Sequence, residues 1–88
     1  MEKRSHVILG IHITDRVQHV PDVQSLFTKY GCSIRTRLGL HNTSGKFCSP
    51  NGLILLEMTG DEEPIWDLME ELQAIEGVDV QKMVFEHE

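Results

Sequence analysis

Residues 53–77, LILLEMTGDEEPIWDLMEELQAIEG, contain the pattern that decides the fold of this chain. The stretch opens with four consecutive apolar residues, which is typical of a central strand covered on both faces. Asp61 then offers an N-cap oxygen, and Pro64 fits the first turn of a helix. Apolar residues follow at helical spacing until Gly77, where a helix can stop: Ile65, Leu68, Met69, Leu72 and Ile75. The stretch therefore predicts a central strand followed by a helix that packs on the sheet.

Patterns on either side of this stretch predict the remaining elements. Residues 6–13 and 79–86 have the apolar content of a first and a last strand. Residues 15–30 predict a helix whose regular part begins near Val20, because the proline that follows fits only a first turn. Residues 32–41 alternate between apolar and polar side chains, which is the clearest strand signal in the chain.

The order of these elements is β-α-β-β-α-β, a recurring supersecondary pattern. It predicts a single α+β domain over residues 1–88, a ferredoxin-like sandwich in which two helices cover one face of a four-stranded antiparallel sheet. The other face stays open. An open face that carries apolar residues usually needs a partner, so we expect a homo-oligomer, a dimer or a tetramer, that associates through it. We expect this face to hold the row His6, Ile8, Gly10 and His12, the row Arg35, Arg37 and His41, and part of the apolar third strand.

Composition narrows the classes of function. The net charge is −6 with only eight lysines and arginines, which argues against direct binding of nucleic acid. No apolar run is long enough to span a membrane, and the start of the chain lacks the pattern of a signal peptide, so we expect a cytoplasmic protein. Two cysteines are too few for a disulfide scaffold.

His41 and Cys48 form the first candidate site. One ends the second predicted strand and the other lies just before the third, so the connecting loop can bring them together. Imidazole and thiolate suit transition metals such as nickel, zinc or copper, and His12 on the neighbouring first strand could add a third ligand. The alternative is that Cys48 is only a small buried apolar residue and that the histidines make ordinary hydrogen bonds.

Arg35 and Arg37 form the second candidate site. Two guanidinium groups on the same side of an edge strand could hold a carboxylate or a phosphate as a ligand. The alternative is that these charges protect an exposed sheet edge from aggregation. We find no arrangement of a nucleophile, a base and an orienting group, so we do not expect an enzyme.

Residues 37–60, RLGLHNTSGKFCSPNGLILLEMTG, carry a family resemblance. They resemble the C-terminal, ACT-like domain of the nickel-responsive transcription regulators, in which a strand ending in histidine is followed by a loop, a cysteine and an apolar strand. The resemblance implies that His41 and Cys48 bind a metal ion such as nickel, zinc or iron between subunits. Gly39 stands where that family has a further histidine. The whole chain also resembles small stand-alone ACT-like proteins described as regulators of the iron-only hydrogenase system.

Together these patterns predict a stand-alone regulatory module that senses a metal ion or a small ligand. The resemblance implies a role in regulating transcription or a hydrogenase system, with a partner protein in place of a DNA-binding domain of its own. The alternative is a protein–protein interaction or assembly domain that binds no ligand.

Overall fold

The computed structural model describes residues 4–14, 20–41 and 52–87 and contains the six predicted elements in the predicted order. The strands and helices are β1 (Arg4–Ile13), α1 (Val20–Lys29), β2 (Ile34–His41), β3 (Gly52–Met58), α2 (Glu62–Gln73) and β4 (Val78–His87). A short 3-10 turn, Gly31–Ser33, precedes β2, so this strand begins two residues later than the sequence predicted. The α+β class and the ferredoxin-like arrangement are confirmed.

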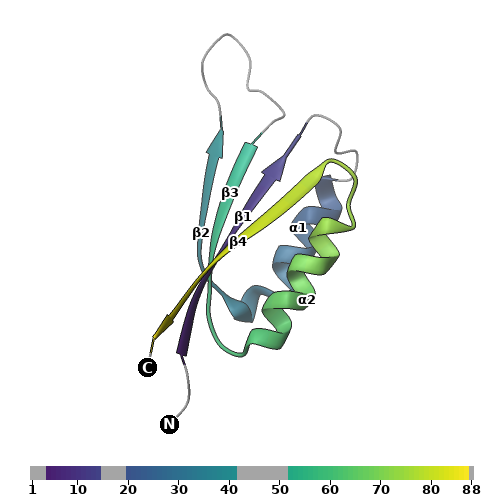
Figure 1. Ribbon diagram of the computed structural model, residues 1–88. Helices are drawn as coiled ribbons and strands as arrows, with labels where there is room; N and C mark the ends of the chain where they lie inside the picture. Colours follow the sequence, from purple (N-terminus) through teal and green to yellow (C-terminus); the bar gives the residue numbers. More distant parts are fainter. Residues whose placement is uncertain (1–3, 15–19, 42–51, 88) are drawn as a thin grey trace.

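The sheet has the strand order β2-β3-β1-β4, and the pairs β1–β3, β1–β4 and β2–β3 are all antiparallel. Both helices lie on one side of the sheet, and no described helix or strand covers the opposite side (Figure 1). β3 and β1 are the central strands, and β2 and β4 form the edges. The helices of this chain therefore cover one face of the sheet only.

The core lies between the helices and the covered face of the sheet. The sheet contributes Val7, Leu9 and Ile11 of β1, Leu56 and Met58 of β3, and Val78 and Val80 of β4. The helices contribute the predicted stripes, of which the buried members are Val23, Phe27, Ile65, Leu68 and Leu72. Burial of a large aliphatic side chain contributes roughly 1.5–3 kcal/mol, so this layer supplies most of the stability of the fold.

Two glycines allow the chain to turn around α2. Gly60 and Gly77 have φ values of 85° and 89°, in the left-handed region that favours glycine. Asp61 occupies the N-cap position with extended backbone, as predicted, but its side chain makes no capping hydrogen bond. Glu62 and Glu63 lie in the first turn, where negative charge stabilises the helix dipole.

A register shift between Ile34 and Thr36 changes the orientation of β2. Beyond this bulge, Arg37 pairs with Leu56, which is buried against the helices, and Leu38 pairs with Leu55. The predicted placement of the row Arg35, Arg37 and His41 on the open face is therefore wrong for Arg37. The physical reason is the extra residue in the bulge, because the alternation of a strand restarts with the opposite parity after it.

Candidate functional site

The open face of the sheet carries large apolar side chains in contact with solvent. Leu38, Met83 and Phe85 are 51%, 51% and 53% exposed. They come from both edge strands, β2 and β4. Ile8 of β1 and Leu55 of β3 lie between these edges and are only partly buried. The apolar residues therefore extend across all four strands, as an interaction surface requires and scattered surface residues do not.

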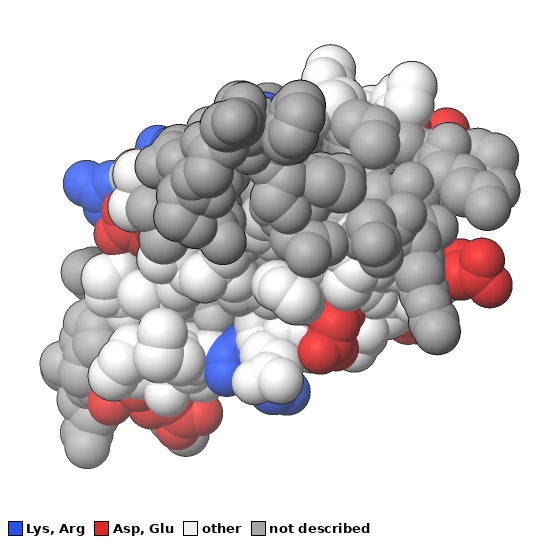
Figure 2. Space-filling view, turned by 90° about the horizontal axis from the view of Figure 1, so that it is seen from above, with Lys and Arg blue, Asp and Glu red and all other residues white. Residues whose placement is uncertain are grey.

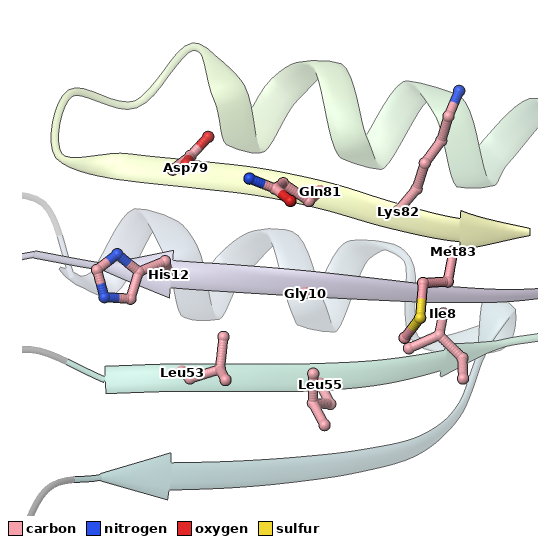
Figure 3. Close-up of a pocket in the computed structure, with 9 residues that line it drawn as sticks. All are labelled: Ile8, Gly10, His12, Leu53, Leu55, Asp79, Gln81, Lys82 and Met83. Atoms are coloured by element: carbon pink, nitrogen blue, oxygen red, sulfur yellow. The ribbon is translucent and has the colours of Figure 1, made fainter.

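A shallow depression of about 450 Å³ lies at the centre of this face (Figure 3). Its lining comes from three strands: Ile8, Gly10 and His12 of β1, Leu53 and Leu55 of β3, and Asp79, Gln81, Lys82 and Met83 of β4. Met83 extends across β1 toward Ile8 at one end, and His12 lies at the other end. The floor is low at Gly10 because this residue has no side chain.

Glu57 lies on the open face beside the depression and is held by two neighbouring strands. Thr36 Oγ1 donates a hydrogen bond of 2.8 Å to Glu57 Oε1, and His6 Nε2 donates one of 2.7 Å to Glu57 Oε2. These two hydrogen bonds lower the pKa of the Glu57 carboxyl, and the charge of Arg35 adds to the effect. Glu57 is therefore a fixed negative charge at this edge of the apolar surface.

The two arginines of the second candidate site do not lie together. Arg37 packs with its guanidinium 4.7 Å from the centre of the Phe27 ring, and its Nη2 donates a 3.1 Å hydrogen bond to Gln24 Oε1 of α1. Arg35 instead contributes to the electrostatic environment of Glu57 on the open face. The expected pair of guanidinium groups on the same side of β2 is thus divided by the bulge, and a role of either residue in ligand binding stays a prediction.

The predicted metal ligands lie partly outside the described residues. Cys48 belongs to the segment 42–51, which the structure does not describe, and for His41 only the backbone at the end of β2 is described. That backbone pairs with Gly52, which pairs with Ile13, whereas His12 pairs with Leu53 in the adjacent row. Within the described part of the chain, no three histidine, cysteine or acidic residues form a group that could hold a metal ion. The three-residue metal site stays a prediction.

A second polar cluster joins the two helices on the covered side. Tyr30 donates a hydrogen bond to Glu71 Oε2, and Lys29 Nζ lies 3.2 Å from Glu71 Oε1. These contacts lower the pKa of Glu71 and raise the pKa values of Tyr30 and Lys29. Because the cluster joins the end of α1 to α2, its role is the attachment of one helix to the other.

The charged side chains that are visible from above the molecule are spread among uncharged ones (Figure 2). The described surface seen from this side does not gather lysines and arginines into one patch of the kind that binds nucleic acid. Neither helix among residues 20–41 and 52–87 has the length and apolar character needed to cross a membrane.

Comparison with solved structures identifies the same fold in proteins that differ in sequence. An uncharacterized protein from Thermotoga maritima superposes with a TM-score of 0.78 at 27% identity, over 96% of this chain and 99% of that one. A nitrogen regulatory PII-like protein from Thiomonas intermedia K12, bound to ADP, AMP and bicarbonate, has a TM-score of 0.62 at 18% identity, over 99% of this chain and 97% of that one.

The ACT domain from GTP pyrophosphokinase of Chlorobium tepidum has a TM-score of 0.61 at 18% identity, over 93% of this chain and 100% of that domain. No family model and no curated protein matches the sequence. The ACT-like fold expected from the sequence is therefore confirmed.

Sequence reasoning missed the residues that make the open face apolar at its β2 edge. The sequence correctly placed Leu38 and Arg37 on opposite sides of the strand. It placed Leu38 under the helices and Arg37 on the open face, and the bulge reverses these two positions. The depression around Gly10 was also missed. The available signal was the mixed row of the first strand, in which a glycine stands between Ile8 and His12.

Proposed function

We propose that this chain is a regulatory domain rather than an enzyme, and that it associates with a second copy through the open sheet face and binds a small ligand there. The observation that carries the proposal is the exposure of Leu38, Met83 and Phe85, each about half exposed, on the face that no helix covers. Solvent-exposed apolar surface of this extent is typical of interaction sites.

The size of the face supports a second copy as the partner. Four strands at ~4.8 Å spacing and about ten residues at ~3.3 Å each give a flat area on the order of 600 Å². The side chains that project from the sheet make the accessible area of the face larger than this flat area. The accessible area therefore comes near the ~800 Å² per partner that a standard interface buries. Two copies of one face also form an isologous contact, the commonest arrangement in homodimers.

The structural neighbours support the regulatory part of the proposal. Their descriptions include a nitrogen regulatory PII-like protein with bound ADP, AMP and bicarbonate, and an ACT domain. By analogy of fold, this chain would be a small-molecule sensor. A role for it in transcription or in a hydrogenase system rests on the sequence resemblance alone.

The mass of the full chain in solution tests the association. We expect light scattering at micromolar concentration to give a dimer or a larger assembly, and we expect the variant Leu38→Lys to give a monomer because it places a charge within the apolar face. Ser25→Lys, on the exposed surface of α1, adds the same charge to the helix layer and should leave the mass unchanged. A monomeric wild-type chain would contradict the proposal.

The metal version of the proposal has its own test. Metal analysis of protein purified without a histidine tag should find nickel, zinc or iron, and the double variant His41→Ala/Cys48→Ser should lose it. Equal retention by wild type and variant would exclude the predicted site, with the assembly proposal unaffected. Chains that associate but bind neither metal nor small molecule would favour a pure assembly domain.

A further inference from the structure

The outer edge of β4 has two halves that differ in how their backbone groups are bonded. In the first half, the side chain of Gln73 in α2 bonds to the strand as a neighbouring strand would. Its Oε1 accepts a 3.4 Å hydrogen bond from the N–H of Val80, and its Nε2 donates a 3.3 Å hydrogen bond to the carbonyl oxygen of Val80. Among the described residues, no side chain bonds in this way to the backbone of Lys82 or Val84 in the second half.

The pairing of β4 with β1 shows which backbone groups of the second half point outward. This pairing is continuous along the whole strand, without a bulge. The backbone N–H and C=O groups of successive residues alternate between the two sides of a strand. Because Val80 directs these groups outward to Gln73, every second residue after it does the same, up to Glu86. Residues 82–86, with Val84 at their centre, therefore offer hydrogen-bonding groups to an added strand.

The same segment exposes apolar side chains on both faces of the sheet. Met83 and Phe85 are half exposed on the open face. Val84 lies on the helix side and is still 37% exposed, although it pairs with the buried Val7, and the end of β4 lies away from both helices (Figure 1). An apolar edge of this kind favours pairing with another strand, and Gln73 occupies only its first half.

The segment is self-complementary when two copies pair antiparallel with Val84 opposite Val84. The side chains of Met83 and Phe85 then face one another, and a thioether makes favourable contacts with an aromatic ring. Lys82 and Glu86 also face one another, and opposite charges stabilise such a cross-strand pair. Each of these pairs occurs twice, because the two strands are identical.

Other registers of the pair are less favourable. A register centred on Lys82 places two ammonium groups opposite each other. Registers centred on Lys82 or on Met83 also use the edge at Val80, whose backbone groups are already bonded to Gln73. The register centred on Val84 avoids both costs.

We propose that residues 82–86 of β4 pair antiparallel with the same residues of a second copy, across a two-fold axis perpendicular to the sheet, so that the two sheets become continuous. Phe85 of the second copy then lies beside Met83, which lines the depression, and extends its apolar wall. The proposal goes beyond the association through the open face, because it uses a different surface. Five paired residues bury much less than the ~800 Å² per partner of a standard interface, so this contact alone is weak.

Cysteine crosslinking of the full chain tests the register. In a Cys32→Ser/Cys48→Ser background, Val84→Cys places two thiols on directly opposite residues, with Cα atoms about 5.5 Å apart, within the range of a disulfide. Lys82→Cys and Glu86→Cys lie on the same side of the strand, but each thiol is then roughly 13 Å along the strand from its own copy. Under oxidation at high protein concentration, Val84→Cys should form the covalent dimer at least about fivefold faster than either control.

A mixture of the two control variants removes the effect of the lost charges. Lys82→Cys and Glu86→Cys in equal amounts should crosslink to each other faster than either variant crosslinks alone, because the register places these two positions opposite each other. Equal rates for the mixture and for each variant alone, or a Lys82→Cys rate above that of Val84→Cys, would overturn the proposal.

A proline at the centre of the segment tests the hydrogen bonds. Val84→Pro removes an outward N–H and no bond to β1, whereas Val84→Thr keeps both the N–H and the branched shape. In sedimentation at high concentration, wild type and Val84→Thr should have an average mass above that of the open-face dimer, and Val84→Pro should have the mass of that dimer. Equal masses for the two variants, both shown to be folded by circular dichroism, would overturn the inference.

The variant Leu38→Lys separates this inference from the proposed function. In this background the order of crosslinking rates should be unchanged, at lower absolute rates, because the edge contact does not use the open face but is strengthened when several edges are joined in one assembly. An open-face dimer with equal crosslinking rates at all three positions would overturn this inference alone. Preferential crosslinking at Val84→Cys in a chain that does not associate through the open face would support the edge contact and contradict the proposed function.

Discussion

The two faces of the sheet use the same four strands and have opposite environments. On the covered face, Val7, Leu9 and Ile11 are at most 1% exposed, because α1 and α2 pack on them. On the open face, Leu38 and Met83 remain half exposed although they are equally apolar. The helices of this chain bury the apolar side chains of the covered face, whereas those of the open face stay exposed, and the proposed second copy would bury them.

Under the proposed function, one face provides the stability of the monomer and the other provides the interaction between copies. Leucines on the two faces should differ in what they contribute: a leucine beneath the helices stabilises the monomer, and a leucine on the open face stabilises the assembly. The predictions below test this division, in order of the effect expected.

The largest effect is expected from truncating the same residue type on opposite faces. Leu9→Ala should lower the free energy of unfolding by about 2–5 kcal/mol, because it leaves a cavity in the core. Leu38→Ala, measured by urea unfolding at protein concentrations where the chain is monomeric, should change it by less than ~0.5 kcal/mol. If both variants lost a similar free energy of unfolding, the open face would contribute to the stability of the monomer, and the two faces would not differ in this respect.

A smaller effect is expected at the bulge of β2, which separates Arg35 from Arg37. Arg37→Ala removes the packing on Phe27 and the hydrogen bond to Gln24, and should cost about 0.5–1 kcal/mol in thermal or chemical unfolding. Arg35→Ala should cost less and should instead raise the pKa of Glu57, which can be followed by NMR titration. The reverse ranking would contradict the assignment of Arg37 to the helix-covered side.

The smallest effect is expected from the bridge between the helices. The pKa of Glu71 is lower in the folded chain than its ordinary value of 4.5, so its contribution to stability is present above that value and is lost as the pH falls through the folded pKa. The pKa values of Tyr30 and Lys29 are raised, so their contributions are present at neutral pH and are lost as the pH rises through the folded pKa values. Unfolding curves should therefore show slightly lower stability at both extremes.

The variant Tyr30→Phe provides the check on this bridge. It should flatten the acidic part of the pH dependence, because Glu71 loses the hydrogen bond that contributes most to its shifted pKa. A pH profile identical to that of wild type would mean that Tyr30 does not stabilise the ionised Glu71.

The sequence was sufficient to predict the order and approximate bounds of the elements. The apolar residues of α2 recur at helical spacing, Pro21 limits the start of α1, and the four apolar residues of β3 are typical of a central strand. Each of these signals lies within one element, and the apolar residues that form it are the ones that pack in the core. The faces of β2 could not be predicted, because one extra residue in a bulge reverses the alternation and leaves no clear pattern in the sequence.

The candidate site was harder to predict than the fold. The depression depends on the register that sets Gly10 between Leu55 and Gln81, and this register joins residues far apart in the chain. The sequence could indicate that the first strand has a mixed face, but not which side chains from β3 and β4 surround its glycine. His41 and Cys48 remain a prediction, because the structure does not describe the segment between β2 and β3.

The central claim, that the open face is covered by a second copy, can be tested within a single spectrum. In a chain with ¹³C-labelled methionine methyl groups, Met58 reports on the covered face at 3% exposure, and Met83 reports on the open face at 51%. With a soluble paramagnetic agent, we predict that the Met83 signal is protected at high protein concentration and becomes broadened on dilution or in Leu38→Lys, whereas Met58 stays protected throughout. Broadening of Met83 to the same extent in wild type and Leu38→Lys at every concentration would contradict the account.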